Sequence, residues 1–170
     1  MSLHSEVTLT PWSMSDAPRL AMLMNDPLVL RYLTHNLPNP YRREDAEKFI
    51  SNALEQQQAD YAILYHGEVV GGISARPRPE KNDCMLGYWL GSAWQGRGIA
   101  TRALRQYLEL LPTLLPDISV ITACIYAPNI ASKRLLLKLG FTCTGSVEDT
   151  PPAGDGNSYP GLEFRKKQER

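Results

Sequence analysis

The stretch Trp94-Gln95-Gly96-Arg97-Gly98-Ile99-Ala100 is the most informative part of this 170-residue sequence. It stands between an apolar run and the start of the most regular helical pattern in the chain. Glycine lets the backbone turn tightly and aim successive N–H groups outward, and a helix N-terminus adds a partial positive charge. Such a loop suits a diphosphate, and the side chains of Arg97 and Arg102 can pair with phosphate oxygens.

Two familiar nucleotide-binding motifs do not fit this glycine loop. A Walker A loop that began at Gly91 would need Lys and then Ser or Thr after Gly96, where the chain has Arg97 and Gly98. A Rossmann fingerprint would need a third small residue at Thr101 and a parallel βαβ opening. The residues alone leave two readings open, which are phosphate binding and a simple strand-to-helix turn.

The apolar positions after the loop have helical spacing and predict a helix over 99–111 that ends at Pro112. The segment 27–42 is predicted to be a partly buried loop or a short helix. Alternating or continuous apolar runs predict strands at 7–10, 61–65, 69–75, 84–90, 118–126, 141–147 and 162–165, and amphipathic patterns predict further helices at 17–24, 44–54 and 130–139.

This order of elements predicts an α/β fold of the mixed α+β kind. We expect a central, mostly antiparallel, twisted sheet of about seven strands, flanked by about four helices. The chain length favours one domain over residues 1–170, with its core at about 6–166.

Charge and composition exclude several functional classes. The 18 Lys and Arg residues balance the 18 Asp and Glu residues, so we expect neither nucleic acid nor an anionic membrane as a partner. No segment resembles a signal peptide or a membrane helix. The three cysteines are few, widely spaced and odd in number, which favours the reducing cytoplasm.

The glycine loop also resembles the acetyl-CoA pyrophosphate signature, Q/R-x-x-G-x-G/A, of the GCN5-related N-acetyltransferases (GNAT). Three further motifs resemble the subgroup of Rim-type ribosomal-protein and spermidine acetyltransferases, and the likeness extends over residues 7–165. These motifs are Tyr88-Trp89-Leu90, Asn129-Ile130-Ala131-Ser132 and Lys138-Leu139-Gly140-Phe141.

The resemblance implies an acetyl-CoA site between two strands that splay apart, where the pantetheine arm completes the sheet. Acetyl-CoA is then a cosubstrate, and no metal is expected because the three histidines share no ligand spacing with each other or with the cysteines. The implied cofactor-binding residues are Tyr88, Trp89, Leu90, Gln95, Gly96, Arg97, Gly98, Ile99, Ala100, Thr101, Asn129 and Ser132.

The implied reaction is direct attack of a primary amine on the acetyl thioester in a ternary complex. Two catalytic groups that are common in the family are missing, since Met85 stands where relatives often have glutamate and Leu136 where they often have tyrosine. Ser132 becomes the candidate general acid that protonates the leaving thiolate. The candidates for general base are Asp83, Glu148 and Glu80.

The resemblance also places the acceptor amine near the first two helices and the loop between the last two strands. Substrate candidates are Arg31, His35 and Tyr41 in the first region, and Glu148, Asp149 and Asp155 in the second. The expected function is an N-acetyltransferase for a protein N-terminus or a small-molecule amine, acting as a monomer or homodimer. A CoA-binding regulatory or catalytically degenerate domain is the alternative, and a nucleotide-phosphate enzyme is a third.

Overall fold

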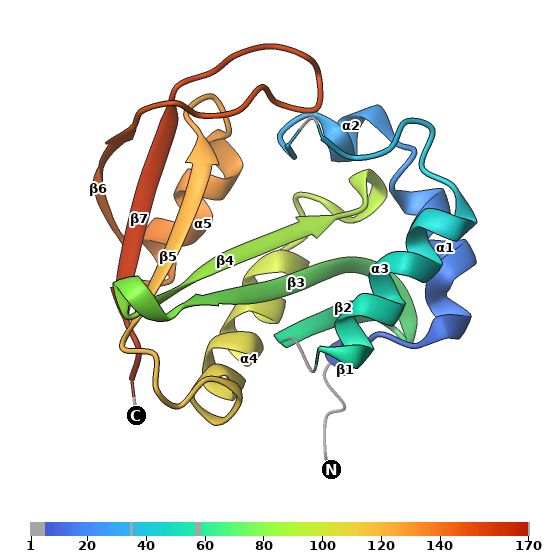
Figure 1. Cartoon of the computed structure of the whole chain (residues 1–170), viewed down its shortest axis with the longest axis horizontal. Coiled ribbons are helices and arrows are strands. Elements are labelled where there is room, and N and C mark those ends of the chain that lie inside the picture. Colours follow the sequence, from blue (N-terminus) through green and yellow to red (C-terminus); the bar gives the residue numbers. More distant parts are fainter. Residues whose placement is uncertain (1–5, 35, 57–58, 170) are drawn as a thin grey trace.

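The computed structural model describes residues 6–34, 36–56 and 59–169. Within that part of the chain, seven strands form one sheet in the order β1-β2-β3-β4-β5-β7-β6. All neighbours pair antiparallel except β4 and β5, which are parallel. The mixed, mostly antiparallel sheet that the sequence predicts is therefore confirmed (Figure 1). The strands are β1 (Val7–Pro11), β2 (Ala59–Tyr65), β3 (Glu68–Arg78), β4 (Asp83–Leu90), β5 (Val120–Tyr126), β6 (Thr142–Val147) and β7 (Gly161–Lys167).

Five α-helices flank the sheet in the described residues, one more than the sequence predicts. The additional helix is the single turn α2. It lies in the segment 27–42, for which the sequence predicts either a loop or a short helix. Asp26 caps it by accepting a hydrogen bond from the N–H of Leu28 at 2.9 Å, and Pro27 fits its first turn. The helices are α1 (Ala17–Leu23), α2 (Pro27–Leu30), α3 (Arg43–Glu55), α4 (Ile99–Leu114) and α5 (Ile130–Lys138).

The helices cover both faces of the sheet. The side chains of α4 and α5 pack into one buried cluster with Val70, Leu86 and Phe164 of the sheet. On the opposite face α1 and α3 form a second cluster with Trp12 and Ala62. The sheet thus separates two cores, and its strands place successive side chains alternately in one or the other.

Helix α4 continues past Pro112, where the sequence predicts its end, as far as Leu114. Proline lacks the N–H that would bond back four residues, and the helix extends only two residues beyond Pro112. The helix then ends, and the N–H of Leu115 closes it on the Leu111 carbonyl at 2.8 Å.

Strands β4 and β5 pair only at their beginnings. The paired positions run from Asp83 opposite Val120 to Leu86 opposite Ala123, and beyond them the two strands diverge (Figure 1). The peptide N–H of Gly91 bonds to Val70 on β3 at 2.7 Å. Because successive peptide groups in a strand point to opposite sides, those of Tyr88 and Leu90 face the gap.

Candidate active site

Two cavities open along this gap, one on each side of it. We call the larger one, of about 670 Å³, the sheet cavity, because the face of the sheet beneath α1 and α3 forms its floor. The smaller one, of about 480 Å³, lies against the glycine loop and α4, and we call it the loop cavity. Both cavities are lined by Tyr32, Leu33, Tyr88, Trp89, Asn129 and Ser132. A molecule in one cavity can therefore meet a molecule in the other.

The glycine loop has the conformation that its sequence favours. Gly96 and Gly98 have φ angles of 72° and 76°, which a side chain rarely adopts, and a Cβ built on either would meet no heavy atom within 4 Å. The Gln95 amide donates to the Leu90 carbonyl at 2.9 Å and so ties the loop to the end of β4. The backbone in front of both glycines is open, and this cradle fits a pyrophosphate.

Eleven of the twelve predicted cofactor residues line the loop cavity. The exception is Arg97, whose guanidinium lies 5.1 Å from the centre of the Tyr65 ring and 3.4 Å from its hydroxyl. The eleven are Tyr88, Trp89, Leu90, Gln95, Gly96, Gly98, Ile99, Ala100, Thr101, Asn129 and Ser132.

The residues shared by both cavities include a buried, unsatisfied hydroxyl. The Tyr88 hydroxyl has no hydrogen-bond partner in the described part of the protein. Burial raises the pKa of Tyr88 to about 12, an effect that the nearby Ser132 hydroxyl opposes. The Asn129 side chain caps α5 by accepting from the Ser132 N–H at 3.3 Å, so the helix start fixes the position of Ser132.

The three candidate bases lie away from this junction. Asp83 is buried at the start of β4, where Arg78 donates two hydrogen bonds to it, at 2.8 and 2.6 Å, and Thr122 donates one at 2.7 Å. The bonds from Arg78 hold the pKa of Asp83 below its usual value. Glu80 and Glu148 are exposed, and none of the three lines either cavity. Their placement supports a structural role for Asp83, in the ion pair with Arg78.

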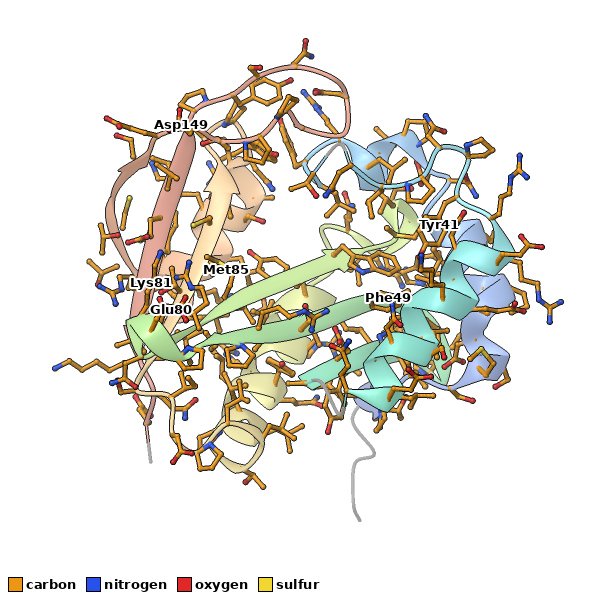
Figure 2. The ribbon with its side chains drawn as sticks, viewed as in Figure 1. Tyr41, Phe49, Glu80, Lys81, Met85 and Asp149 are labelled. Carbon is orange, nitrogen blue, oxygen red and sulfur yellow. The ribbon has the colours of Figure 1, made fainter. Side chains whose placement is uncertain are left out.

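The two positions where relatives often have a glutamate and a tyrosine lie in different surroundings. Leu136 is fully buried in the core beneath α5, so that position contributes packing in this chain. Met85 lies on the floor of the sheet cavity, where it adds apolar surface (Figure 2).

The substrate candidates divide between the cavities. Tyr41 is buried and lines the sheet cavity, and burial together with Asp45 raises its pKa to about 12. Arg31 lines the loop cavity, with its guanidinium 4.9 Å from the centre of the Tyr32 ring. His35 lies outside the described residues. Of the acidic candidates, Asp149 lines the sheet cavity, whereas Asp155 does not and instead accepts a hydrogen bond from Tyr159.

One charged pair of the sheet cavity, Asp60 and Arg76, is not predicted by the sequence. The Arg76 guanidinium donates to the Asp60 carboxylate at 2.8 Å, and both residues line the sheet cavity. The signal available in the sequence was a charged residue within each of two apolar strands, β2 and β3.

The loop between β6 and β7 forms a roof over the gap. It crosses from the β6 side toward α2 (Figure 1), where the N–H of Gly154 bonds to the Leu33 carbonyl at 2.6 Å. Tyr159 from this loop contacts the rings of Tyr32 and Tyr126 edge-on, at 6.0 and 6.1 Å between centroids. We call residues 148–160 the roof loop. It connects the two halves of the molecule that the divergence of β4 and β5 separates.

The sequence and the fold both match known acetyltransferases. A family model described as "Acetyltransferase (GNAT) domain" matches residues 6–142. The chain belongs to the GNAT family. YdaF of Bacillus subtilis (strain 168), by its name a candidate ribosomal N-acetyltransferase, is 25% identical over 155 residues, which cover 86% of this chain and 84% of YdaF.

Solved structures of other GNAT proteins share the fold. RimJ of Mycobacterium smegmatis in complex with CoA-disulfide superposes with a TM-score of 0.84 at 21% identity, covering 95% of this chain and 81% of RimJ. MccE, the microcin C7 self-immunity acetyltransferase, in complex with acetyl-CoA and AMP, gives 0.82 at 22% identity, covering 98% and 95% of the two chains. The family resemblance inferred from the sequence is confirmed, with a ribosomal N-acetyltransferase by name among the relatives, and so is the acetyltransferase class.

Two features are absent from the described residues. No described helix is long and apolar enough to cross a bilayer. No group of three or more His, Cys, Asp or Glu side chains is placed to bind a metal ion within the same residues.

Proposed function

We propose that this GNAT protein transfers an acetyl group from acetyl-CoA in the loop cavity to a primary amine in the sheet cavity. The observation that carries the proposal is the junction of the two cavities at Tyr88, Trp89, Asn129 and Ser132. Direct attack requires the two reactants within about 3–3.5 Å of each other, and such proximity supplies much of the rate enhancement. Two separate cavities that meet at one place satisfy that requirement.

The glycine loop would bind the pyrophosphate of the cosubstrate, and the unpaired part of β4 would bind its pantetheine arm. Open N–H groups at Gly96 and Gly98, at the start of α4, would hold the pyrophosphate. The Leu90 N–H and the Tyr88 carbonyl, which lack a partner on β5, would pair with the amides of the pantetheine arm as a neighbouring strand does. Arg97 would reach a phosphate only by leaving Tyr65.

The chemical step breaks the C–S bond of the thioester and forms a C–N bond to the amine. The Tyr88 N–H, which faces the gap farther from the glycine loop than Leu90, would stabilise the negative charge that develops on the carbonyl oxygen. An α-amine has a pKa of about 8, so a fraction of it is neutral at pH 7, and it would release its second proton to water in the open sheet cavity. The thiolate accepts a proton at the other side of the junction.

Ser132 is our candidate proton donor for the thiolate, with Tyr88 behind it. A tyrosine whose pKa is about 12 stays protonated at neutral pH and can donate a hydrogen bond. Its hydroxyl has no described partner, so it is available to the Ser132 hydroxyl once Ser132 turns toward a thiolate. The two hydroxyls would then stabilise the thiolate by hydrogen bonds, and a proton that Ser132 gives to the thiolate would be replaced from solvent, because the raised pKa of Tyr88 disfavours loss of its own proton.

Cysteine usage supports a cytoplasmic location for the enzyme. Cys84, Cys124 and Cys143 are all free thiols, which a reducing compartment maintains. We propose a monomer or a homodimer that binds no nucleic acid and no membrane, in line with the balanced charge of the sequence.

Amine-dependent thiol release tests the proposal. The purified protein is mixed with acetyl-CoA and with each of a panel of amines that includes N-terminal peptides, arylalkylamines and spermidine. We expect thiol release that depends on both acetyl-CoA and an amine, with an equal amount of N-acetylated product detected by mass spectrometry. Release at the same rate without amine would reduce the activity to hydrolysis and contradict the proposal.

A further inference from the structure

The walls of the sheet cavity are mainly aromatic and aliphatic. Trp12 and Phe49 lie edge to face at 6.0 Å, and Tyr41 lines the cavity on the same side. Figure 2 shows Tyr41 and Phe49 on the α3 side of the opening and Met85 on the sheet. These surfaces favour a ligand that exchanges water for carbon contacts.

A glycine in β3 makes room for the two indoles on the cavity floor. A Cβ on Gly72 would lie 2.7 Å from Nε1 of Trp89 and 3.1 Å from Cζ2 of Trp12. Glycine therefore lets both rings lie close against the sheet. The floor beneath the acceptor is flat and aromatic, a surface on which another ring packs well.

Deep in the sheet cavity, no described carboxylate is unpaired and able to bind a cationic ligand. The Asp60 side chain is only 2% exposed, and the carboxylate binds Arg76. Asp149 lines the cavity from the roof loop, where it is exposed to solvent (Figure 2). Among the described residues, no other carboxylate lines this cavity.

Arg76 adds a positive charge to the same floor. Its side chain is 42% exposed, and Asp60 is the only described residue that accepts a hydrogen bond from its guanidinium. Asp60 faces Ser74 across β2 and β3, and Ser74 faces Gly87 across β3 and β4, so the ion pair lies beside the start of the gap. A second ammonium group in this cavity would approach a guanidinium and would find Asp60 already paired.

On the basis of the proposed function, we infer that the acceptor is a monoamine with an aromatic or branched apolar body, and that the Asp60–Arg76 pair rejects polyamines. The apolar walls bind the body of the acceptor, and the amine points toward the junction at Ser132. A polyamine would bury a second positive charge among aromatic rings beside Arg76, where the one carboxylate, Asp60, is already paired and Asp149 lies apart on the exposed roof loop. The body can belong to a free amine or to the first residue of a peptide.

Two matched pairs of acceptors test the substrate class. The first pair is 2-phenylethylamine and 1,4-diaminobutane, and the second is a short peptide that begins with Phe and the same peptide beginning with Ala. We expect kcat/KM to be at least about tenfold higher for the aromatic member of each pair. If the enzyme accepts only free amines or only peptides, the same ratio is expected within the pair that it accepts. Equal values, or a preference for the diamine or the Ala peptide, would overturn the inference.

The ion pair is tested by two variants of Arg76. Arg76→Gln leaves the Asp60 carboxylate unpaired in the cavity and should lower the ratio of kcat/KM for 2-phenylethylamine over 1,4-diaminobutane by about tenfold. The double variant Arg76→Gln, Asp60→Asn has neither charge, and its ratio should return toward the wild-type value. An unchanged ratio in Arg76→Gln would show that the Asp60–Arg76 pair does not determine the choice between monoamines and diamines.

Direct binding provides a readout that does not depend on turnover. Calorimetry of the CoA-saturated protein should detect 2-phenylethylamine and should give at least about tenfold weaker binding for 1,4-diaminobutane. Tighter binding of the diamine would contradict the inference even if the purified enzyme turned over neither amine. Titration with acetyl-CoA tests the proposed function separately from the substrate class. If acetyl-CoA binds normally and the diamine is preferred, only the inferred substrate class is wrong. If acetyl-CoA does not bind, the proposed function is wrong.

Discussion

Tyr88 on β4 and Ser132 on α5 both line the two cavities of this protein, on either side of the place where β4 leaves β5. The buried Tyr88 hydroxyl lacks a described hydrogen-bond partner, and the Ser132 hydroxyl is close enough to oppose the rise in its pKa. An unsatisfied buried hydroxyl costs about 1–3 kcal/mol. A ligand that hydrogen-bonds at the junction of the cavities would offset that cost, as the proposed function expects.

Replacing the Ser132 hydroxyl should slow transfer without weakening cosubstrate binding. Ser132→Ala removes the candidate proton donor, and we expect kcat to fall about ten- to a hundredfold while the dissociation constant of acetyl-CoA changes little. Single-turnover rates and calorimetry measure the two quantities separately. Ser119→Ala provides the control, because Ser119 bonds to Asn82 outside both cavities. An unchanged kcat in Ser132→Ala would exclude Ser132 from the chemistry.

A side chain at Gly98 should block the pyrophosphate. Gly98→Val fills the open space before the loop, and we expect the affinity for acetyl-CoA to fall at least about tenfold. Gly67→Val is the matched control, since Gly67 has nearly the same φ, 79°, and equally open surroundings but lines neither cavity. Both variants carry a similar backbone strain, of about 1–2 kcal/mol. Equal acetyl-CoA affinity in the two variants would show that the loop does not hold the pyrophosphate.

A side chain at Gly154 should lift the roof loop. A Cβ there would lie 1.9 Å from the Leu30 carbonyl oxygen, so Gly154→Ala must displace the loop from α2. We expect KM for the amine to rise about tenfold, with little change in acetyl-CoA affinity, because the roof loop covers the sheet cavity. Gly156→Ala is the control within the same loop, since its Cβ would meet nothing within 4 Å and the variant differs from wild type only by the backbone strain of its φ of 83°. The same KM in both variants would contradict a role for the roof loop in acceptor binding.

The Asp83–Arg78 pair should contribute to stability in a pH-dependent way. The side chain of Asp83 is 3% exposed, and Asp83→Asn should lower the free energy of unfolding by about 2 kcal/mol at pH 7. Because folding lowers the pKa of Asp83, this contribution is complete above the unfolded pKa of about 3.9. It is lost as the pH falls through the lower folded value. Urea denaturation at several pH values measures the difference.

The same variant separates a structural from a catalytic role for Asp83. The wild-type protein and Asp83→Asn should show equal turnover for each folded molecule, because Asp83 lines neither cavity. Loss of turnover in a fully folded Asp83→Asn would restore Asp83 as a candidate base.

The sequence predicts the order of strands and the glycine loop because those features depend on local signals. Positive φ at Gly98, for example, follows from the steric freedom of glycine, and the alternation of Val7 and Leu9 with threonines marks β1. The sequence does not decide whether α2 is a loop or a helix, since a helix of four residues, Pro27–Leu30, carries too little periodicity.

Features formed by distant parts of the chain could not be predicted in the same way. Asp60 and Arg76 meet only because β2 and β3 pair in one register, and Gly154 reaches Leu33 across 121 positions of sequence. The candidate base Asp83 illustrates the converse, because a carboxylate near a motif in sequence is instead held by Arg78 and Thr122 at the far end of β4. Register and burial decide these contacts, and neither is encoded within a short window.

The decisive experiment is calorimetric titration of the purified protein with acetyl-CoA, with ATP and NAD as controls. It tests whether the loop cavity and the unpaired edge of β4 form an acetyl-CoA site. We predict one molecule of acetyl-CoA bound to each chain, with no comparable heat from ATP or NAD, because the loop and the unpaired edge of β4 together fit a pyrophosphate joined to a pantetheine arm. No binding of acetyl-CoA, or equal binding of ATP, would contradict this prediction.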